Sequence, residues 1–358
     1  MLRPLLVIGI GGSGGKTIRS MKQALERRLL SVRYNDGIPA AWQFLQIDTT
    51  YDGVNFPAPM LSKNDVQVVV PPGATFETIL KSMTNRATLA EQHKIFAGWG
   101  IATTAVSVAN GAGQIRGIGR QVGVADSART LDAIKSAIAK MNAPLAKAEL
   151  ASVAKALGAE PPFDGPQAFI ISSLAGGSGA GMFMDVAELL KRATSSPWAH
   201  ESVAFLYTSE VFDSLGDGAK DVSKNSLGAM NEITASRLVP LSERTKLLFN
   251  KFGLSTNYYS EIGYGARTNI FIGKTNKTGI DISQGADGSG MDEVFLTIGE
   301  ALAGALTNDD ISEFYYQQAF VNITQTPSSL DKSGLAPDRK STRLNSSHAN
   351  ISYAVFCL

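Results

Sequence analysis

Short apolar runs that end in glycine clusters are the feature of this sequence that most restricts its fold. The run LLVIG at Leu5–Gly9 leads into IGGSGGKT, and the run AFIIS at Ala168–Ser172 leads into SLAGGSGAG. Residues with helical spacing follow each cluster. Continuous apolar strands that alternate with helices are typical of a parallel sheet covered on both faces. Ligands bind such sheets at the carboxyl ends of the strands, where the glycine clusters fall.

The same pattern continues along the chain and predicts the order of the elements. Strands are expected at Leu5–Gly9, Trp42–Ile47, Val66–Val70, Ala168–Ser172, Val203–Tyr207 and Asn269–Ile272. Helices are expected at Thr17–Leu30, Phe76–Met83, Ala125–Met141, Met182–Arg192, Leu227–Leu238 and Val294–Leu306. We therefore expect a three-layer α/β fold with a mostly parallel sheet and helices on both faces.

The composition favours a globular protein without a polyanionic partner. The chain has 358 residues, 44% of them hydrophobic, and its 33 basic and 32 acidic side chains leave a net charge of +1. Duplex binding needs a concentrated basic surface, which this balance does not provide. No apolar run approaches the roughly 18 residues that span a bilayer, and no signal peptide is recognisable. We expect a cytoplasmic protein that binds no nucleic acid and has no membrane span.

Residues that bind structural metals are scarce. Cys357 is the only cysteine, and the three histidines, His93, His200 and His348, lie far apart in the sequence. A structural zinc site is therefore not expected.

The first glycine cluster, residues 9–17, permits several interpretations. Glycine lets the backbone approach a phosphate, and a helix N-terminus supplies N–H groups and a positive dipole end. A P-loop needs G-x-x-x-x-G-K-[ST], but Ile10 stands where its first glycine belongs. A dinucleotide fold needs G-x-G-x-x-G, which Gly9, Gly11 and Gly14 supply, although Asp48 lies farther along the chain than the acidic residue of that fold. Two further interpretations of this cluster stay open. It is either a turn that only packs the helix on the strand, without a ligand, or a phosphate loop of the kind that the second glycine cluster indicates.

The second glycine cluster is more specific. Residues 175–181, AGGSGAG, resemble the tubulin signature [SAG]-G-G-T-G-[SA]-G, with Ser178 in place of the threonine. Serine keeps the hydroxyl, and small residues at a helix start form a nest of N–H groups that can surround phosphate oxygens. The chain thus resembles the tubulin/FtsZ superfamily, and within it the bacterial tubulin-like domain proteins.

Other segments follow in the order of that superfamily, over about Leu5 to Leu306. Residues 11–14, GGSG, resemble its first phosphate loop, and Asp48-Thr49 resembles the step after its second strand. Residues 110–113, NGAG, with IGR at 118–120, resemble the loop that contacts the γ-phosphate. The resemblance implies that the chain binds GTP or GDP, with Mg²⁺ on the phosphates.

The resemblance also implies which residues form the nucleotide site. They are Gly11, Gly12, Ser13, Gly14, Lys16, Asp48, Thr49, Gly111, Ala112, Gly113, Gly176, Gly177, Ser178, Gly179, Ala180, Gly181, Asn225 and Asp292. Asn225 is expected near the ribose or base, or else caps its helix without touching a ligand. Guanine recognition needs an acceptor for N1–H and the 2-amino group, and Asp292, with the strand end near Asn276, is the candidate. Lys16 replaces an asparagine of the family, and it either adds charge near a phosphate or faces solvent.

Hydrolysis in this superfamily uses an acidic residue after the central helix, which reaches the γ-phosphate of a neighbouring subunit and positions water. Asp309 and Asp310 are the candidates here, with Glu313 behind them. A solvated acidic turn is the alternative for this segment.

We expect three parts in the chain. Residues 1–306 form the GTP-binding domain with the central helix, and residues 307–338 begin a truncated second domain. Residues 339–358, RKSTRLNSSHANISYAVFCL, resemble a read-through of sequencing-adapter DNA and continue no earlier pattern.

Three functions are compatible with these motifs. The first is a GTPase that self-associates into filaments and hydrolyses GTP between subunits. The second is a GTP-binding sensor or scaffold that does not polymerise. The third is an NAD-type oxidoreductase based on Gly9, Gly11 and Gly14, for which no hydride-transfer residues stand out.

Overall fold

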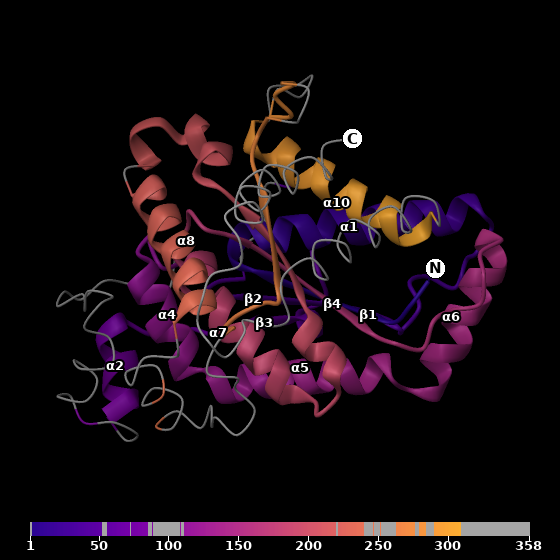
Figure 1. Ribbon diagram of the computed structural model, residues 1–358, viewed down its shortest axis with the longest axis horizontal. Coiled ribbons are helices and arrows are strands. Elements are labelled where there is room, and N and C mark those ends of the chain that lie inside the picture. The colour runs from indigo at the N-terminus through magenta and orange to yellow at the C-terminus, as the bar shows by residue number, and fades with distance from the viewer. Residues whose placement is uncertain are drawn as a thin grey trace, which may run out of the picture.

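A parallel sheet forms the centre of the computed structural model (Figure 1), which describes residues 2–51, 56–71, 73–84, 88, 108, 111–219, 221–239, 246, 251, 263–275, 279–283 and 290–308. The six strands lie in the order β3-β2-β1-β4-β5-β6, and all neighbouring strands run parallel. The strands are β1 (Leu5–Ile10), β2 (Trp42–Asp48), β3 (Val66–Val68), β4 (Gln167–Ser173), β5 (Val203–Tyr207) and β6 (Thr268–Ile272). The predicted α/β fold with helices on both faces is confirmed.

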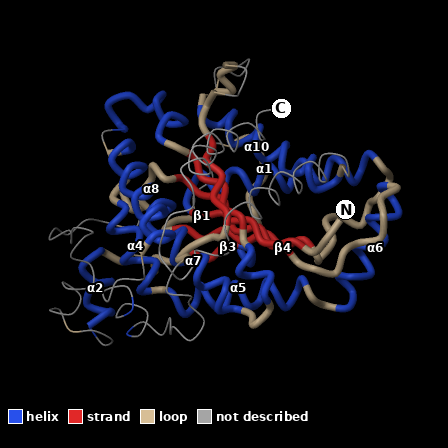
Figure 2. The backbone as a smooth tube through the Cα atoms, viewed as in Figure 1, coloured by secondary structure: helices blue, strands red, loops and turns tan. Residues whose placement is uncertain are grey.

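Helices cover both faces of this sheet (Figure 2). One face packs against α1 (Gly11–Ser31), α6 (Pro144–Leu157) and α10 (Met291–Thr307). The other packs against α2 (Phe76–Thr84), α4 (Arg116–Ala125), α5 (Ser127–Met141), α7 (Ser178–Ala193) and α8 (Val222–Leu238). Short 3₁₀ segments are η1 (Lys63–Asp65), η2 (Pro197–Glu201) and η3 (Ser209–Ala219).

Strand β1 shows why both faces are buried. Successive side chains of a strand point to opposite faces, so Leu6 and Ile8 join the core under α4, α5 and α7, whereas Leu5 and Val7 join the core under α1 and α10. All six residues of β1 are buried. A strand of this kind must be apolar throughout, as the continuous apolar run indicated.

Several boundaries differ from those expected. Helix α1 begins at Gly11 rather than at Thr17, so the first glycine cluster is part of the helix. Residues 116–141 form two helices that meet at Asp126, and α6 was not predicted. Glycine lowers the helix propensity of residues 116–125, where packing supplies stability, whereas the alanine-rich α6 has high helix propensity but few large apolar residues to mark a buried face.

Helix α10 lies directly along α1, which places its N-terminus beside the glycine loops. A Cβ on Gly299 would lie 2.6 Å from the Cβ of Ser20 and 2.7 Å from the backbone N of Met21. The Ser20 hydroxyl donates a hydrogen bond to the carbonyl of Leu296 at 3.0 Å. The absence of a side chain at Gly299 therefore allows the two helices to approach closely.

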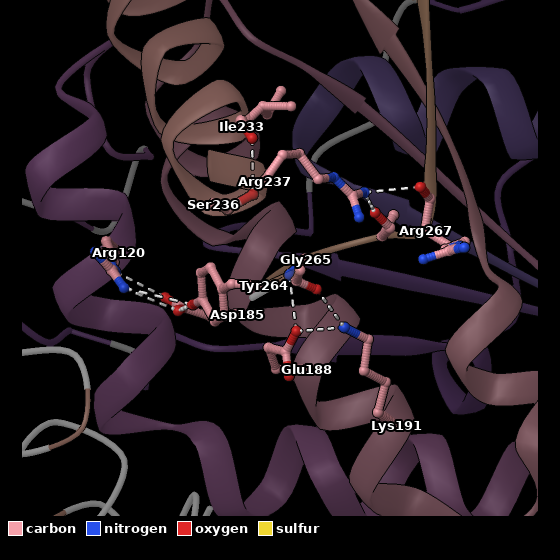
Figure 3. A network of polar contacts seen from close by, with 12 residues as sticks. Arg120, Asp185, Glu188, Lys191, Ile233, Ser236, Arg237, Tyr264, Gly265 and Arg267 are labelled. Carbon is pink, nitrogen blue, oxygen red and sulfur yellow. Dashed lines mark hydrogen bonds and ion pairs between the residues drawn. The ribbon is translucent and has the colours of Figure 1, made fainter. Parts of the chain in front are cut away.

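A buried polar network holds the segment that leads into β6 (Figure 3). Asp185 on α7 accepts hydrogen bonds from Arg120 at 2.9 Å and from the Tyr264 hydroxyl. Glu188, one turn further on, accepts from Lys191 at 2.6 Å and from the Gly265 N–H at 2.7 Å. Burial raises the pKa of both carboxyl groups, while Arg120 and Lys191 respectively lower it.

No helix among the described residues combines the length and the apolar character needed to cross a membrane.

Candidate functional site

The carboxyl ends of β1, β2 and β4 bring three segments together at one edge of the sheet. In the strand register, Gly9 lies beside both Gln46 and Ile171. The residues that follow these strands, Gly11, Thr49 and Leu174, therefore begin close together at the carboxyl end of the sheet. A loop before α4, residues 111–115, joins them from the chain that precedes that helix.

The first glycine segment is shaped mainly by close backbone packing. A Cβ on Gly14 would lie 2.3 Å from the carbonyl oxygen of Ile171, and one on Gly9 would lie 2.5 Å from the carbonyl oxygen of Gly14. Gly11 has a φ of +69°, a backbone conformation that residues other than glycine rarely adopt. These glycines let α1 begin against the sheet, so that Gly12 and Ser13 line a cavity at its N-terminus.

The second glycine segment packs against the loop before α4. A Cβ on Gly177 would lie 2.8 Å from the Cβ of Ala112, and one on Gly181 would lie 2.5 Å from the carbonyl oxygen of Arg116. A Cβ on Gly179 would lie 2.7 Å from the Ser172 hydroxyl. Three glycines of the AGGSGAG segment are thus required by contacts within the protein.

Gly12 and Gly176 differ from these glycines. A Cβ on either residue would meet no heavy atom within 4 Å, and neither residue has a positive φ. Both line the same cavity. Neither the neighbouring atoms nor the backbone conformation requires glycine at these two positions, so the space that they leave open belongs to the cavity.

The lining of the cavity combines polar and apolar residues. Its volume is about 240 Å³, just below the roughly 300–1,000 Å³ of small-molecule sites. The polar and backbone-exposing residues are Gly12, Ser13, Lys16, Gln114, Ser173, Ala175 and Gly176, and the apolar residues are Phe212, Leu215, Val222, Met291 and Phe295. The rings of Phe212 and Phe295 lie 6.3 Å apart at a tilt of 46°. This volume and lining suit a small molecule with both polar and planar apolar parts.

Asn225 on α8 connects two of the loops. Its Nδ2 donates to the carbonyl of Gln114 at 2.6 Å and to the carbonyl of Ala175 at 3.0 Å. The residue is buried, and α8 begins at Val222, with no side-chain hydrogen bond at its N-cap. Asn225 therefore does not cap its helix. It joins the second and third loops from behind the cavity.

A second contact from α8 supports the same loop. Arg116, the first residue of α4, forms an ion pair with Glu232 at 2.6 Å. Burial raises the pKa of Glu232, and Arg116 lowers it. The start of α4 is thus held to α8 immediately after the loop that lines the cavity.

Asp48 and Thr49 connect the end of β2 to the start of α7. The Thr49 N–H donates to Asp48 at 2.7 Å, and the hydroxyls of Thr49 and Ser178 lie 2.9 Å apart. Burial raises the pKa of Asp48 from its ordinary value of 3.8 to about 6, against hydrogen bonds from Thr49, Ser178 and Gln46 that lower it. Asp48 holds the loops together and is not among the residues that line the cavity.

Lys16 and Asp292 form an ion pair beside Phe295, one of the apolar lining residues. The Lys16 ammonium lies 2.6 Å from Asp292, in the first turn of α10. The side chains are 27% and 20% exposed, so this pair is partly removed from solvent. Lys16 also lines the cavity, so of the two alternatives for this residue it does not simply face solvent.

The structure thus separates the predicted site residues by role. Those that line the cavity are Gly12, Ser13, Lys16 and Gly176. Those that hold the surrounding loops in place are Gly11, Gly14, Asp48, Thr49, Gly177, Ser178, Gly179, Gly181 and Asn225. Gly111, Ala112 and Gly113 lead into Gln114, and Ala180 is buried in α7. Asn110, Asn276, Asp309, Asp310 and Glu313 lie outside the described residues.

The prediction from the sequence did not include the apolar residues that line the cavity. Phe212, Leu215 and Val222 come from η3 and α8, and Met291 and Phe295 flank Asp292 on α10. Gln114 directly follows the glycine-rich residues 111–113, and Ser173 lies shortly before the glycine-rich residues 175–181. This position beside a glycine-rich segment could have predicted both as lining residues. The apolar residues have no such signal, because a phenylalanine in a cavity and one in the core look alike in a sequence.

Comparison with known proteins agrees with this architecture. A family model described as tubulin like matches residues 6–303. The chain belongs to this tubulin-like family. The predicted resemblance to the tubulin/FtsZ superfamily is therefore confirmed.

One solved structure similar to this tubulin-like chain is CetZ from Methanosaeta thermophila. The TM-score is 0.41 at 12% sequence identity, over 99% of this chain and 61% of the other. The chain thus spans about three fifths of the length of that protein. No curated protein matches the sequence.

Proposed function

We propose that this tubulin-like chain binds a guanine nucleotide, GTP or GDP, in the cavity at the carboxyl edge of the sheet. The observation that carries the proposal is the open space above Gly12 and Gly176. Glycine costs backbone entropy on folding, and here no packing contact or left-handed backbone accounts for it. A phosphate that approaches the main chain does, because a Cβ at either position would occupy the space of a phosphate oxygen.

The two kinds of lining residue fit the two parts of a nucleotide. The phosphates would lie at Gly12, Ser13 and Gly176, where α1 and α7 begin and their N-terminal N–H groups attract anions. The base would lie against Phe212 and Phe295, whose rings suit contact with a planar ring. Asp292 is not itself a lining residue, and it would accept hydrogen bonds from the base beside Lys16, with which it is paired. Mg²⁺ would come with the phosphates, which supply most of its oxygen ligands.

We further propose that GTP is hydrolysed where two copies of the full-length protein meet. The lining residues within the described part of the chain include no carboxylate. A group that positions the attacking water must then come from elsewhere, as it would if Asp309 or Asp310 of a second copy completed the site. Filament formation by the full-length protein follows from this arrangement. A sensor that holds GTP without hydrolysis is the second candidate, and the same lack of a lining carboxylate favours it.

The test measures bound nucleotide and phosphate release at increasing concentrations of the full chain. Nucleotide content is read after denaturation of the purified protein, and Gly176→Ala serves as the variant with a filled phosphate position. We expect guanine nucleotide in the wild type, and much less in the variant at equal thermal stability.

The rate per subunit distinguishes the two candidates. A rate that rises with protein concentration supports hydrolysis between subunits, whereas bound GTP with a flat rate near zero supports the sensor. A wild type that retains and binds no guanine nucleotide contradicts the proposal as a whole.

A further inference from the structure

Asp48 ends β2 with a buried carboxylate that is surrounded by neutral hydrogen-bond donors. It accepts from the Thr49 N–H at 2.7 Å and from the Thr49 hydroxyl at 3.3 Å, and Ser178 and Gln46 also hydrogen-bond to it. The residue is 6% exposed. Burial of an ionised carboxylate is costly unless a cation pairs with it. The charge state of Asp48 is therefore sensitive to any further negative charge placed nearby.

The charged groups on the elements around Asp48 do not neutralise it in the described part of the chain. Burial is the largest influence on the pKa of Asp48, and the hydrogen bonds that oppose burial come from neutral residues. The neighbouring elements carry Lys16, paired with Asp292, and Arg19, hydrogen-bonded to the Ala58 carbonyl, on α1; Arg129, paired with Asp126, on α5; Asp185, paired with Arg120, on α7; and Lys63 and Asp65 in η1.

Two hydroxyls connect this carboxylate to the glycine loops. The hydroxyl oxygens of Thr49 and Ser178 lie 2.9 Å apart, and Ser178 is the first residue of α7. A Cβ on Gly11 would lie 3.5 Å from the Cβ of Ser178. The hydrogen bonds therefore run from the buried carboxylate to the helix start near which the phosphates of a nucleotide would lie.

The charge on Asp48 sets the direction of these hydrogen bonds. An ionised carboxylate only accepts, and each hydroxyl has a single proton to donate. The Thr49 hydroxyl donates to Asp48, so an ionised Asp48 draws the hydroxyl protons toward itself. A phosphate oxygen is also an acceptor and would meet only the lone pairs of Ser178. A protonated Asp48 donates instead, which leaves the Ser178 proton free to point at a phosphate.

Electrostatic repulsion favours the same protonated form. A phosphate beside Ser178 would be separated from the Asp48 carboxylate by one hydroxyl group, and a nearby like charge raises the pKa of a carboxyl. Burial has already raised the pKa of Asp48 to about 6. At neutral pH the group is thus mostly ionised before binding, and a further rise makes it take up a proton.

We propose that Asp48 is a positioning residue of the nucleotide site, which takes up a proton from solvent when the phosphates bind and thereby turns the Thr49 and Ser178 hydroxyls toward them. This inference rests on the proposed function and adds a dependence of nucleotide binding on pH. Affinity should be greatest below about pH 6, where Asp48 holds its proton before binding, and should fall as pH rises.

The experiment counts the protons by titration calorimetry of the full chain with GDP and Mg²⁺. The binding enthalpy is measured at about pH 7.5 in buffers that differ in ionisation enthalpy, and the slope gives the number of protons taken up. Asp48→Asn is the variant, because its amide donates and accepts as the protonated acid does. The exposed Asp132→Asn is the matched control, and thermal unfolding confirms that both are folded.

We expect the wild type to take up about half a proton or more per nucleotide, and its affinity to fall about threefold to tenfold per pH unit above neutrality. Asp132→Asn should behave in the same way. Asp48→Asn should bind at least as tightly as the wild type at about pH 8, and its proton uptake should be lower by about half a proton or more.

Three results would overturn this inference and leave the proposed function standing. The first is equal proton uptake in the wild type and Asp48→Asn, and the second is a wild-type affinity that stays constant from about pH 6 to about pH 8. The third is a folded Asp48→Asn that binds no GDP, because its amide supplies the same donor as the acid. A wild type that binds no guanine nucleotide would overturn the proposed function together with this inference.

Discussion

Gly176 and Gly177 are neighbours in the sequence, but the space around them differs: only Gly177 is too closely packed to carry a side chain. A side chain on Gly177 would collide with Ala112, 2.8 Å from its Cβ position, whereas one on Gly176 would project into the open cavity. Gly177 is needed for close packing, whereas Gly176 leaves space in the cavity. Substitution at these two positions therefore separates stability from binding.

Gly176→Ala should leave the free energy of unfolding nearly unchanged and weaken guanine-nucleotide binding by about tenfold or more. Gly177→Ala should lower the free energy of unfolding by about 1–3 kcal/mol, because overpacking forces the loop at Ala112 to move. Urea unfolding and nucleotide titration check both. Equal stability loss in the two variants would contradict the assignment.

Gly12→Ala provides a second test of the cavity in a different loop. Gly12 is in the first turn of α1, where alanine is a better helix former than glycine. We expect an unchanged or higher melting temperature and weaker nucleotide binding in the same variant. Undiminished binding would show that the space above Gly12 holds no phosphate.

Asn225→Ala should weaken nucleotide binding because it releases two loops from each other. The variant loses the hydrogen bonds to Gln114 and Ala175, at an expected cost of about 1–3 kcal/mol in unfolding free energy. Asn231→Ala, an exposed position on the same helix, is the matched control and should behave as the wild type. Binding is measured under conditions where both variants are fully folded. If Asn225→Ala binds as tightly as Asn231→Ala, the two hydrogen bonds do not shape the site.

Asp48 should make stability depend on pH in a defined window. The folded protein holds the Asp48 proton up to about pH 6, whereas an ordinary aspartate releases it near 3.8. Because the pKa of Asp48 is raised in the folded protein, its contribution to stability is fully present below pH 3.8, the ordinary pKa. This contribution is lost as pH rises through about 6. Its size is about 3 kcal/mol, at about 1.4 kcal/mol per pKa unit.

Asp48→Asn should remove this dependence, because the amide stays neutral throughout. Urea unfolding at intervals from pH 4 to pH 7.5 measures it, with the exposed Asp132→Asn as control. The stability of Asp48→Asn relative to the wild type should rise between pH 4 and pH 6.5. A constant difference between the two proteins across this range would refute the raised pKa.

Glu188 and Lys191 should show strong coupling in a double-mutant cycle. Both side chains are at least nine-tenths buried, at 1% and 10% exposed, and their charged groups lie 2.6 Å apart. Glu188→Gln leaves a buried ammonium without its charge partner, so we expect a loss of about 3–5 kcal/mol in unfolding free energy. The double variant Glu188→Gln with Lys191→Met should lose less than the sum of the two single losses. Additive losses in urea unfolding would show that the pair does not act as a unit.

The layered fold follows from patterns that are local in the sequence. Continuous apolar runs such as Leu5–Gly9 and Ala168–Ser172 indicate strands buried on both faces, because a strand between two helical layers has no polar side. The glycine clusters after them indicate strand ends that approach other backbone closely. These signals were sufficient for the strands, the sheet type and the superfamily.

Tertiary structure alone decided which of the glycines face the cavity and which pack against other backbone. Gly12, Gly14, Gly176 and Gly177 are alike in the sequence, and they differ only in the atoms that segments far along the chain place around them. The pairing of Lys16 with Asp292 joins residues 276 positions apart, through the close approach of α1 and α10. No periodicity reports such a contact, because side-chain partners are set by the packing of whole helices. The sequence by itself determined the layers and the edge of the sheet where the cavity lies, and packing between distant segments determined which residues line that cavity.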